Sequence, residues 1–397
     1  MPTNFYWIIT AQFFSAIADN AALFIGINLI EKVSQTNWHI VLPKLALIGS
    51  YVLLAPIVGL LADRYPKSLV MFFANSLKLV SCLLLLMPVP PMLTFLFIGI
   101  GAAIYAPAKF GIVTELLPGS MLVKANGWIE SATVGSVLIG TVLGGYLCSN
   151  FLDDEFYIGV LILVIFYLIA ALLNLQIKRT SSVYHNLSPW KLAIEDFFQA
   201  NRVLWKDKIA RVALLTTTMF WGIAASLQIL TVAWARDSLH LDLGQTAYLQ
   251  GLSAAGIILG AVMASRWIRM EQVFRLFPVG LAIGFFVLCF QFVHAWWVAA
   301  VLMIIVGAFS GFFLVPMNAL LQHRGHVLLT AGRSIAVQNF NESFSVLVFL
   351  GLTSCMISFN YPYSVLFLIL GMLILVCIAL TIIRIARQKD VETELHH

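Results

Sequence analysis

The sequence predicts an all-α membrane protein with twelve transmembrane helices in two six-helix halves that repeat each other in parallel. Of the 397 residues, 61% are hydrophobic and only 10% are charged, against about 25% charged residues in ordinary soluble domains. The apolar residues form long runs, each close to the roughly 20 residues that a helix needs to cross a bilayer. These runs do not alternate with polar residues, as strands of a membrane barrel do, so helices are predicted.

Twelve apolar runs are candidate spans. They lie near residues 5–30, 39–62, 69–89, 91–113, 126–150, 156–177, 210–236, 244–267, 273–294, 296–321, 332–359 and 361–385. No small-residue cleavage site follows the first run, so we expect a retained span and not a signal peptide.

Loop charge predicts the orientation of these spans. If the N-terminus is placed inside, most of the 23 Lys and Arg residues fall on the inner face, while the outer face receives Lys32, Lys44, Arg236 and the acidic loop 153–155. Cytoplasmic loops carry such an excess of positive charge, so both termini are expected in the cytoplasm. The basic residues form no single groove, which disfavours a nucleic-acid partner.

The longest polar stretch, residues 178–209, divides the chain into an N-terminal half (1–177) and a C-terminal half (210–387), followed by a tail (388–397). Apolar side chains recur at helical spacing on one face of this linker: Trp190, Ile194, Phe197, Phe198, Leu204 and Trp205. The pattern predicts a helix that lies at the membrane surface. The alternative is a soluble linker helix that packs on the loops.

The two halves echo each other at corresponding spans. Segment 105–109 (YAPAK) recurs as 314–318 (LVPMN), and Glu130 with its following serine recurs at Glu342. Parallel repeats of this kind place a binding site at the interface of the halves, near the middle of the membrane.

Asp19 and Asn20 lie in the middle of the first predicted span. A carboxylate at that depth costs a few kcal/mol even on lenient insertion scales, so we expect Asp19 to face a hydrated cavity or a partner. The structural alternative is a buried carboxyl tied to a neighbouring helix.

Lys109 follows a proline near the cytoplasmic end of the fourth span. It either snorkels to the lipid headgroups or places its ammonium in a central cavity, where it would attract a phosphate. Lys124 and Glu130 follow around the next cytoplasmic turn. In the eleventh span, polar residues are unusually dense and are expected to line the cavity or to switch its access: Arg333, Gln338, Asn339, Asn341 and Glu342.

Segment 59–67 (GLLADRYPK) resembles the loop signature between spans two and three of the major facilitator superfamily. The resemblance implies that Gly59 lets helices approach and that Asp63, with Arg64 and Lys67, latches the halves at the cytoplasmic side. The carboxylate is expected to meet the positive N-terminal end of the eleventh helix, near Arg333. The sequence departs from the signature at Pro66, which replaces its second glycine, and lacks the trailing basic pair.

Further segments resemble one branch of that superfamily, the bacterial lysophospholipid transporters. They are 11–13 (AQF), 19–20 (DN), 55–59 (APIVG), 71–75 (MFFAN), 105–112 (YAPAKFGI), 122–127 (LVKANG), 311–313 (GFF), 316–322 (PMNALLQ) and 335–339 (IAVQN). The resemblance implies inward movement of single-chain phospholipids across a Gram-negative inner membrane, where an acyltransferase partner restores the missing chain. It also implies that Asp19 and Lys109 belong to a headgroup pocket. A family arginine in span seven is replaced here by Gln228.

This substrate suits the polar residues of the spans. Lys109 can supply charge to a phosphate, and Asn20, Gln228 and Asn339 can hydrogen-bond glycerol or ethanolamine. Asp19 could meet an ammonium, or could hold Lys109 in its charged form. We expect a monomer with lysophosphatidylethanolamine or lysophosphatidylglycerol as substrate and no cofactor.

Two other functions fit the sequence less well. A proton-coupled exporter of amphipathic drugs would share the fold, but segment 140–145 (GTVLGG) has Thr141 where the antiporter signature has proline. A lipid-modifying enzyme would need a nucleophile with a base, a carboxylate pair or a metal cluster at membrane depth. The eight His and five Cys residues are scattered and form no such motif, so we expect neither catalysis nor a metal site.

Overall fold

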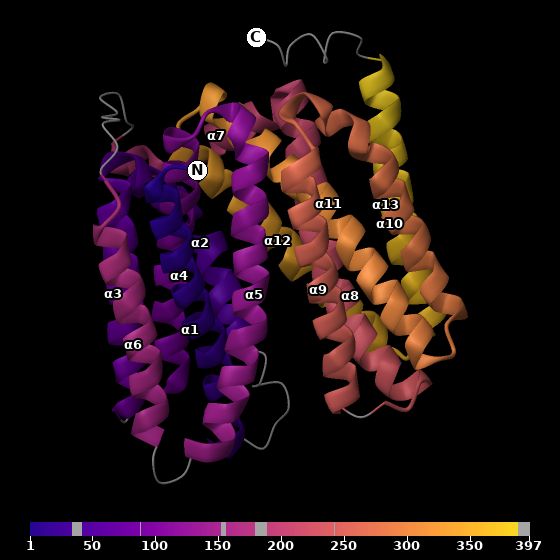
Figure 1. Cartoon of the computed structure of the whole chain (residues 1–397), viewed down its shortest axis with the longest axis horizontal. Helices are drawn as coiled ribbons and strands as arrows, with labels where there is room; N and C mark the ends of the chain where they lie inside the picture. Colours follow the sequence, from indigo (N-terminus) through magenta and orange to yellow (C-terminus); the bar gives the residue numbers. More distant parts are fainter. Residues whose placement is uncertain (34–41, 88, 152–155, 179–188, 242, 388–397) are drawn as a thin grey trace. The chain divides into compact units, whose positions relative to one another are not determined.

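The computed structural model describes residues 1–33, 42–87, 89–151, 156–178, 189–241 and 243–387, and within these ranges the chain is helical without a strand (Figure 1). Eleven helices of the described part are long and apolar enough to cross a membrane. A further helix, α1, runs over Thr3–Val33 and has 31 residues. The predicted all-α membrane class is confirmed. The acidic loop 153–155 and the tail 388–397 lie outside the described residues.

Twelve helices of the described part follow the predicted spans in order, and α7 lies in the predicted linker. They are α1 (Thr3–Val33), α2 (Leu42–Arg64), α3 (Lys67–Leu83), α4 (Pro91–Leu116), α5 (Gly119–Phe151), α6 (Phe156–Leu175), α7 (Ala193–Lys206), α8 (Lys208–Ser238), α9 (Leu243–Trp267), α10 (Phe277–Cys289), α11 (Trp296–Leu328), α12 (Ala331–Ser358) and α13 (Tyr363–Arg387). Short 3₁₀ segments are η2 (Leu84–Leu86), η3 (Trp190–Leu192), η4 (Met270–Leu276) and η5 (Phe290–Phe292).

Two helices extend well beyond their predicted spans. Helices α5 and α11 each have 33 residues, which at 1.5 Å per residue gives about 50 Å, whereas the hydrocarbon core is about 30 Å thick. Their ends therefore reach past the apolar layer. Hydropathy marks only the apolar part of such a helix, because its polar ends continue the same backbone hydrogen bonding.

The chain forms two compact units. Unit 1 consists of Met1–Pro118, Ala132–Val203 and Gly325–Phe340, and unit 2 of Gly119–Ser131, Leu204–Arg324 and Asn341–His397. The start of α5 thus belongs to unit 2, and the start of α12 belongs to unit 1. These units are defined by packing alone, and the predicted boundaries at 177 and 210 stay a prediction.

Unit 1 packs α1 closely against its neighbours through small side chains. Ala18, Ala21 and Ala22 of α1 are fully buried in a cluster with larger residues of α3, α4 and α6. Phe95 of α4 and Tyr167 of α6 are among the largest buried side chains of this cluster. The alanines bring the backbone of α1 near its neighbours, so a polar side chain on α1 can reach partners on other helices.

Helix α7 carries two different apolar faces. Phe197 and Leu204 are buried, and the Phe197 ring packs edge-on against Phe340 at 5.2 Å between centroids. Ile194 and Phe198 are exposed instead. Phe197 and Leu204 therefore pack on protein while Ile194 and Phe198 stay exposed, and the position of this helix at the membrane surface stays a prediction. Residues 179–188 of the predicted linker lie outside the described part.

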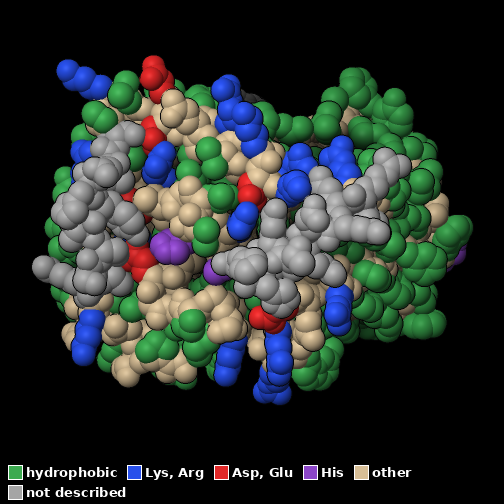
Figure 2. Space-filling model, turned by 90° about the horizontal axis from the view of Figure 1, so that it is seen from above, with side chains coloured by type: hydrophobic (Ala, Val, Ile, Leu, Met, Phe, Trp, Pro, Cys, Tyr) green, Lys and Arg blue, Asp and Glu red, His purple; other side chains and the backbone are tan. Residues whose placement is uncertain are grey.

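Basic side chains gather at the helix ends that lie on the side of α7. Figure 2 looks down on this end and shows many Lys and Arg side chains among a few acidic ones. Such a concentration agrees with the expected cytoplasmic face.

In unit 2, α9 and α11 approach each other through glycines. A Cβ atom at Gly260 would lie 1.9 Å from the Ala308 carbonyl oxygen, and one at Gly307 would lie 2.2 Å from the Ser253 carbonyl oxygen. Gly256 and Gly311 meet carbonyl oxygens of the facing helix in the same way. Small residues at four-residue spacing allow such close contact between membrane helices.

The substitution Gly260→Val should lower the thermal unfolding temperature of the detergent-purified protein, because the new side chain meets backbone that cannot move aside. The expected loss is about 1–3 kcal/mol or more. Gly251→Val, on the same helix, is the control, since a Cβ there meets nothing within 4 Å. Equal melting temperatures of the two variants would contradict the close α9–α11 contact.

Candidate functional site

A buried ion pair lies in the middle of unit 1. Lys78 of α3 places its Nζ 2.8 Å from Oδ2 of Asp19 on α1, and it also donates to Ser15 Oγ at 3.1 Å. Tyr167 of α6 donates its hydroxyl to the other Asp19 oxygen at 2.9 Å. Ser15 in turn donates to Asn75 Oδ1 at 2.8 Å. Side chains from two neighbouring helices, α3 and α6, therefore satisfy a carboxylate that sits among apolar residues.

This network agrees with one of the alternatives that the sequence left open, a buried carboxyl tied to a neighbouring helix. Asp19 forms its ion pair with Lys78 of α3, and a role of Asp19 in holding Lys109 charged stays a prediction. Lys78 is 1% exposed, while the Asp19 side chain retains 25% exposure. Asp19 thus has a partner on a neighbouring helix and also an open side. Lys78 is difficult to recognise as a partner from sequence, because a lysine within a span usually snorkels to the surface.

Aromatic rings complete the surroundings of Lys78. Its Nζ lies 5.5 Å from the ring centroid of Tyr105 and 5.8 Å from that of Tyr167. Electron-rich ring faces attract a cation by up to about 2 kcal/mol when water is excluded. The buried Tyr105 hydroxyl lies near the buried side chains of Asn75 and Asn174. Polar groups therefore continue beyond the ion pair into the same helix cluster.

The five predicted substrate residues are found in different environments. Lys109 is buried on α4 with its Nζ 4.2 Å from the Phe110 ring centroid. Asn20 donates to the carbonyl of Ala16 one turn earlier, and Gly140 of α5 packs against this stretch of α1.

The other two predicted substrate residues are Asn339 and Gln228. Asn339, in unit 1, has its Nδ2 buried with no partner among the described residues. Gln228 is exposed on α8 of unit 2, and its backbone carbonyl accepts a hydrogen bond from Gln250. A common headgroup pocket for these residues with Asp19 and Lys109 remains a prediction.

A second charged centre lies where α2 meets the start of α12 in unit 1. Asp63 accepts hydrogen bonds from the backbone N–H groups of Gly332 at 2.9 Å and Arg333 at 3.0 Å, and from the Thr330 hydroxyl. A carboxylate at a helix N-terminus satisfies free N–H groups and interacts favourably with the helix dipole. The contact with this helix end is the one expected from the sequence.

Small residues make this junction possible. A Cβ at Gly59 would lie 2.9 Å from Cβ of Ala336 and 3.0 Å from Cα of Arg333. At Gly332 it would lie 2.7 Å from Oδ1 of Asp63. Both glycines therefore leave the space through which the carboxylate reaches the helix end.

The basic residues of the junction take partners that the sequence did not reveal. Lys67 lies 2.6 Å from Oε1 of Glu115 and 3.5 Å from Oδ1 of Asp63. The Arg333 guanidinium lies 2.5 Å from Oδ1 of Asp196 on α7, so Arg333 approaches Asp63 through its backbone only. The Arg64 guanidinium lies 4.7 Å from the Trp190 ring centroid.

The remaining predicted gating residues belong to unit 2. Lys124 is exposed at the start of α5, while Glu130 and Glu342 are partly buried. Sequence reasoning missed a polar pair beside them: Asn126 of α5 and Gln322 of α11 exchange two amide hydrogen bonds, of 2.8 and 3.0 Å. Both residues occur in segments that resemble the transporter branch. They are 196 positions apart, so no local sequence pattern shows that they pair.

Comparisons with known proteins agree with this architecture. The sequence profile of the family described as Major Facilitator Superfamily matches residues 8–349. The chain is 40% identical to a lysophospholipid transporter of Photorhabdus laumondii over 358 residues, which is 89% of each chain. It is also 40% identical to one of Pectobacterium carotovorum over 353 residues, 88% of this chain and 86% of the relative.

Solved structures share the fold at low identity. The transporter FucP in its outward conformation has a TM-score of 0.75 at 16% identity and covers 97% of this chain and 98% of its own. A bacterial homologue of the iron transporter ferroportin has a TM-score of 0.73 at 16% identity, over 96% of this chain and 99% of its own.

Removal of one partner of the Asp19–Lys78 pair should be more harmful than removal of both. Asp19→Asn leaves a buried ammonium without its counter-charge, so the unfolding free energy should fall by about 3–5 kcal/mol. Lys78→Met should lower the unfolding free energy by a similar amount. The double variant should be more stable than the sum of the single losses predicts, as thermal unfolding in detergent can measure. Strict additivity would show that the pair is not coupled.

Proposed function

The chain belongs to the major facilitator superfamily, and on that basis we propose that it carries lysophospholipids, which have one acyl chain, across a membrane. The observation that supports this most directly is the 40% identity with proteins named lysophospholipid transporters over 89% of each chain. The charged groups among the apolar helices of unit 1 support the same substrate class, because a phosphate headgroup within a membrane needs cations and hydrogen-bond donors.

The proposed headgroup site combines the ion pair with Lys109. The Lys109 ammonium supplies charge to the phosphate. Asp19 retains an open side beside its contact with Lys78 and can accept hydrogen bonds from glycerol or ethanolamine. Asn20 and Asn339 contribute amides, and the Gln228 amide of α8 is proposed as a further hydrogen-bonding group for the substrate. The acyl chain remains against apolar helix surface or lipid.

The junction around Asp63 is proposed as the latch of alternating access. Asp63 ties α2 to the start of α12, and Lys67 fixes the carboxylate from one side. Hydrogen bonds to a charged group contribute about 1.5–3 kcal/mol each, which is enough to favour one state and small enough to be reversed. Lys124, Glu130 and Glu342 are proposed to take part in the same switch from unit 2.

The proposed direction is inward, across a Gram-negative inner membrane with both termini in the cytoplasm. There a cytoplasmic-side acyltransferase restores the missing chain, so the transporter leaves its substrate chemically unchanged and needs no cofactor. We propose a monomer. The basic helix ends on the side of α7 support this orientation (Figure 2). Exposed Ile194 and Phe198 support contact of α7 with the lipid surface.

Purified protein in proteoliposomes should take up radiolabelled lysophosphatidylethanolamine, and Lys109→Ala should reduce the initial rate by about tenfold or more, the loss of one charge-assisted contact. Lys191→Ala, which removes an exposed lysine of η3, should leave the rate unchanged. Uptake should persist when a protonophore collapses the proton gradient. Absence of uptake, or uptake that requires the gradient together with drug export, would favour the proton-coupled exporter instead.

Asp63→Asn should slow uptake several-fold while lysolipid binding to the detergent-purified protein stays near that of the wild type. The variant loses the negative charge at the start of α12 but touches no proposed headgroup residue. Thr330→Val removes only one of the donors to Asp63, so its rate should fall less. A wild-type rate for Asp63→Asn would exclude the latch, and a parallel loss of binding would place Asp63 in the substrate site.

A further inference from the structure

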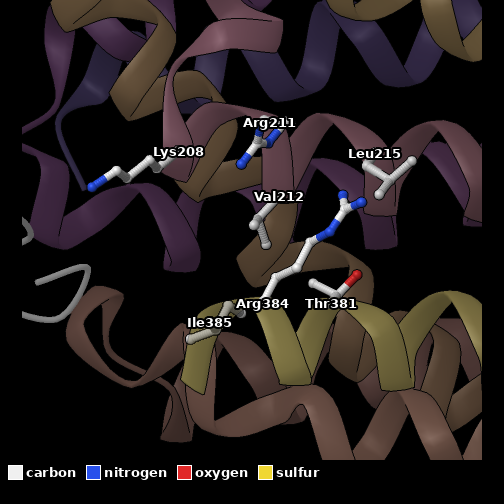
Figure 3. Close-up of a pocket in the computed structure, with 7 residues that line it drawn as sticks. All are labelled: Lys208, Arg211, Val212, Leu215, Thr381, Arg384 and Ile385. Carbon is white, nitrogen blue, oxygen red and sulfur yellow. The ribbon is translucent and has the colours of Figure 1, made fainter. Parts of the chain in front are cut away.

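A basic hollow lies between the start of α8 and the end of α13 in unit 2, and none of the residues that line it is a proposed headgroup residue. It measures about 370 Å³, including space open to solvent, and its walls carry Lys208, Arg211 and Arg384 beside Val212, Leu215 and Ile385. Figure 3 shows the Arg211 and Arg384 side chains in the space between the two helices, whereas the Lys208 ammonium points away.

Among the described residues, no carboxylate near this hollow is left to balance its positive charge. Helix α13 contains no acidic residue, and the one in α8, Asp237, lies at its opposite end and accepts the Tyr363 hydroxyl. Asp207, just before α8, is occupied by Arg324 at 3.0 Å and by the backbone N–H of Ala210. Within the described part of the chain, neither Arg211 nor Arg384 forms an ion pair. The start of α8 adds the positive end of its dipole.

The chemistry of the walls points to a phosphate. Guanidinium groups match phosphate oxygens in geometry and charge. Apolar side chains line the rest of the hollow, and Leu380 and Ile383 beside Arg384 are exposed at 53% and 48%. A soluble anion gains nothing from such apolar surface, whereas the acyl chains of a membrane lipid do.

We propose that this hollow is a binding site for the headgroup of an anionic two-chain phospholipid, such as phosphatidylglycerol, of the leaflet at this end of the helices. Arg211 and Arg384 bind the phosphate, and Lys208 can turn to add a third cation. The acyl chains lie against the outer faces of α8 and α13. Basic pockets between membrane helices bind lipid headgroups in this way. The bound lipid stays with the protein and is not transported. It links the start of α8 to the end of α13.

Native mass spectrometry of the full-length protein, taken from nanodiscs with increasing fractions of phosphatidylglycerol in phosphatidylcholine, tests the site. Wild-type protein should retain phosphatidylglycerol in preference to phosphatidylcholine. Arg211→Gln/Arg384→Gln should weaken retention roughly ten- to thirtyfold, as expected for two cations at a membrane surface. Arg211→Lys/Arg384→Lys should recover part of it. The matched control Arg266→Gln/Arg275→Gln removes two exposed arginines of unit 2 outside the hollow and should retain lipid like the wild type.

Two outcomes of this experiment would overturn the proposal. Equal retention by the pocket and control variants would show that the lipid binds through overall charge. Displacement of the lipid by inorganic phosphate or glycerol phosphate at low concentration would identify a site for a soluble anion. Uptake of zwitterionic lysophosphatidylethanolamine, measured on the same variants, separates this site from the transport site: the pocket variant should still transport.

Discussion

The interaction on which unit 1 depends is the ion pair between Lys78 and Asp19. A charged side chain in the middle of an apolar helix is unfavourable unless another group neutralises it. Here the buried Lys78 ammonium supplies the counter-charge and the Tyr167 hydroxyl donates a hydrogen bond to the carboxylate, while Ser15 accepts a hydrogen bond from Lys78. The alanines of α1 make the arrangement possible, because they let the helix backbone come close to α3 and α6. The pairing of the Asp19 carboxylate therefore depends on the small residues of the same helix.

The same principle operates at the α2–α12 junction, with a helix end in place of a lysine. Asp63 binds the N–H groups of Gly332 and Arg333, and the two glycines of the contact provide the necessary space. Lys67 and Glu115 add a buried pair of their own. Because most donors to Asp63 belong to α12, any movement of α12 away from α2 breaks several charge-assisted bonds together. That cooperativity is what a switch between two states requires.

The sequence predicted the fold class, the order of the spans and the contact of Asp63 with the eleventh span, which is α12. Hydropathy and a local motif are both patterns over short sequence distances. It did not predict the partners. The sequence allows Asp19 to be tied to a neighbouring helix but does not identify Lys78 as the partner. It also does not show that Arg333 directs its guanidinium to Asp196. Pairings between helices distant in sequence leave no local pattern. The α9–α11 glycine contact was missed for the same reason, since a glycine in a span reveals nothing about which helix it faces.

The ion pair also constrains how a headgroup can bind. A phosphate near Lys78 would compete with the Asp19 carboxylate for the same ammonium, so full displacement would leave a carboxylate without its counter-charge. At the proposed site, the less costly arrangement would keep the pair intact, place the phosphate on Lys109 and use the open side of Asp19 for the hydroxyl or ammonium groups of the headgroup. Such a site would contact only part of the headgroup and would not surround it. Modest affinity is what transport needs, because a lipid bound tightly in one state would not be released in the other.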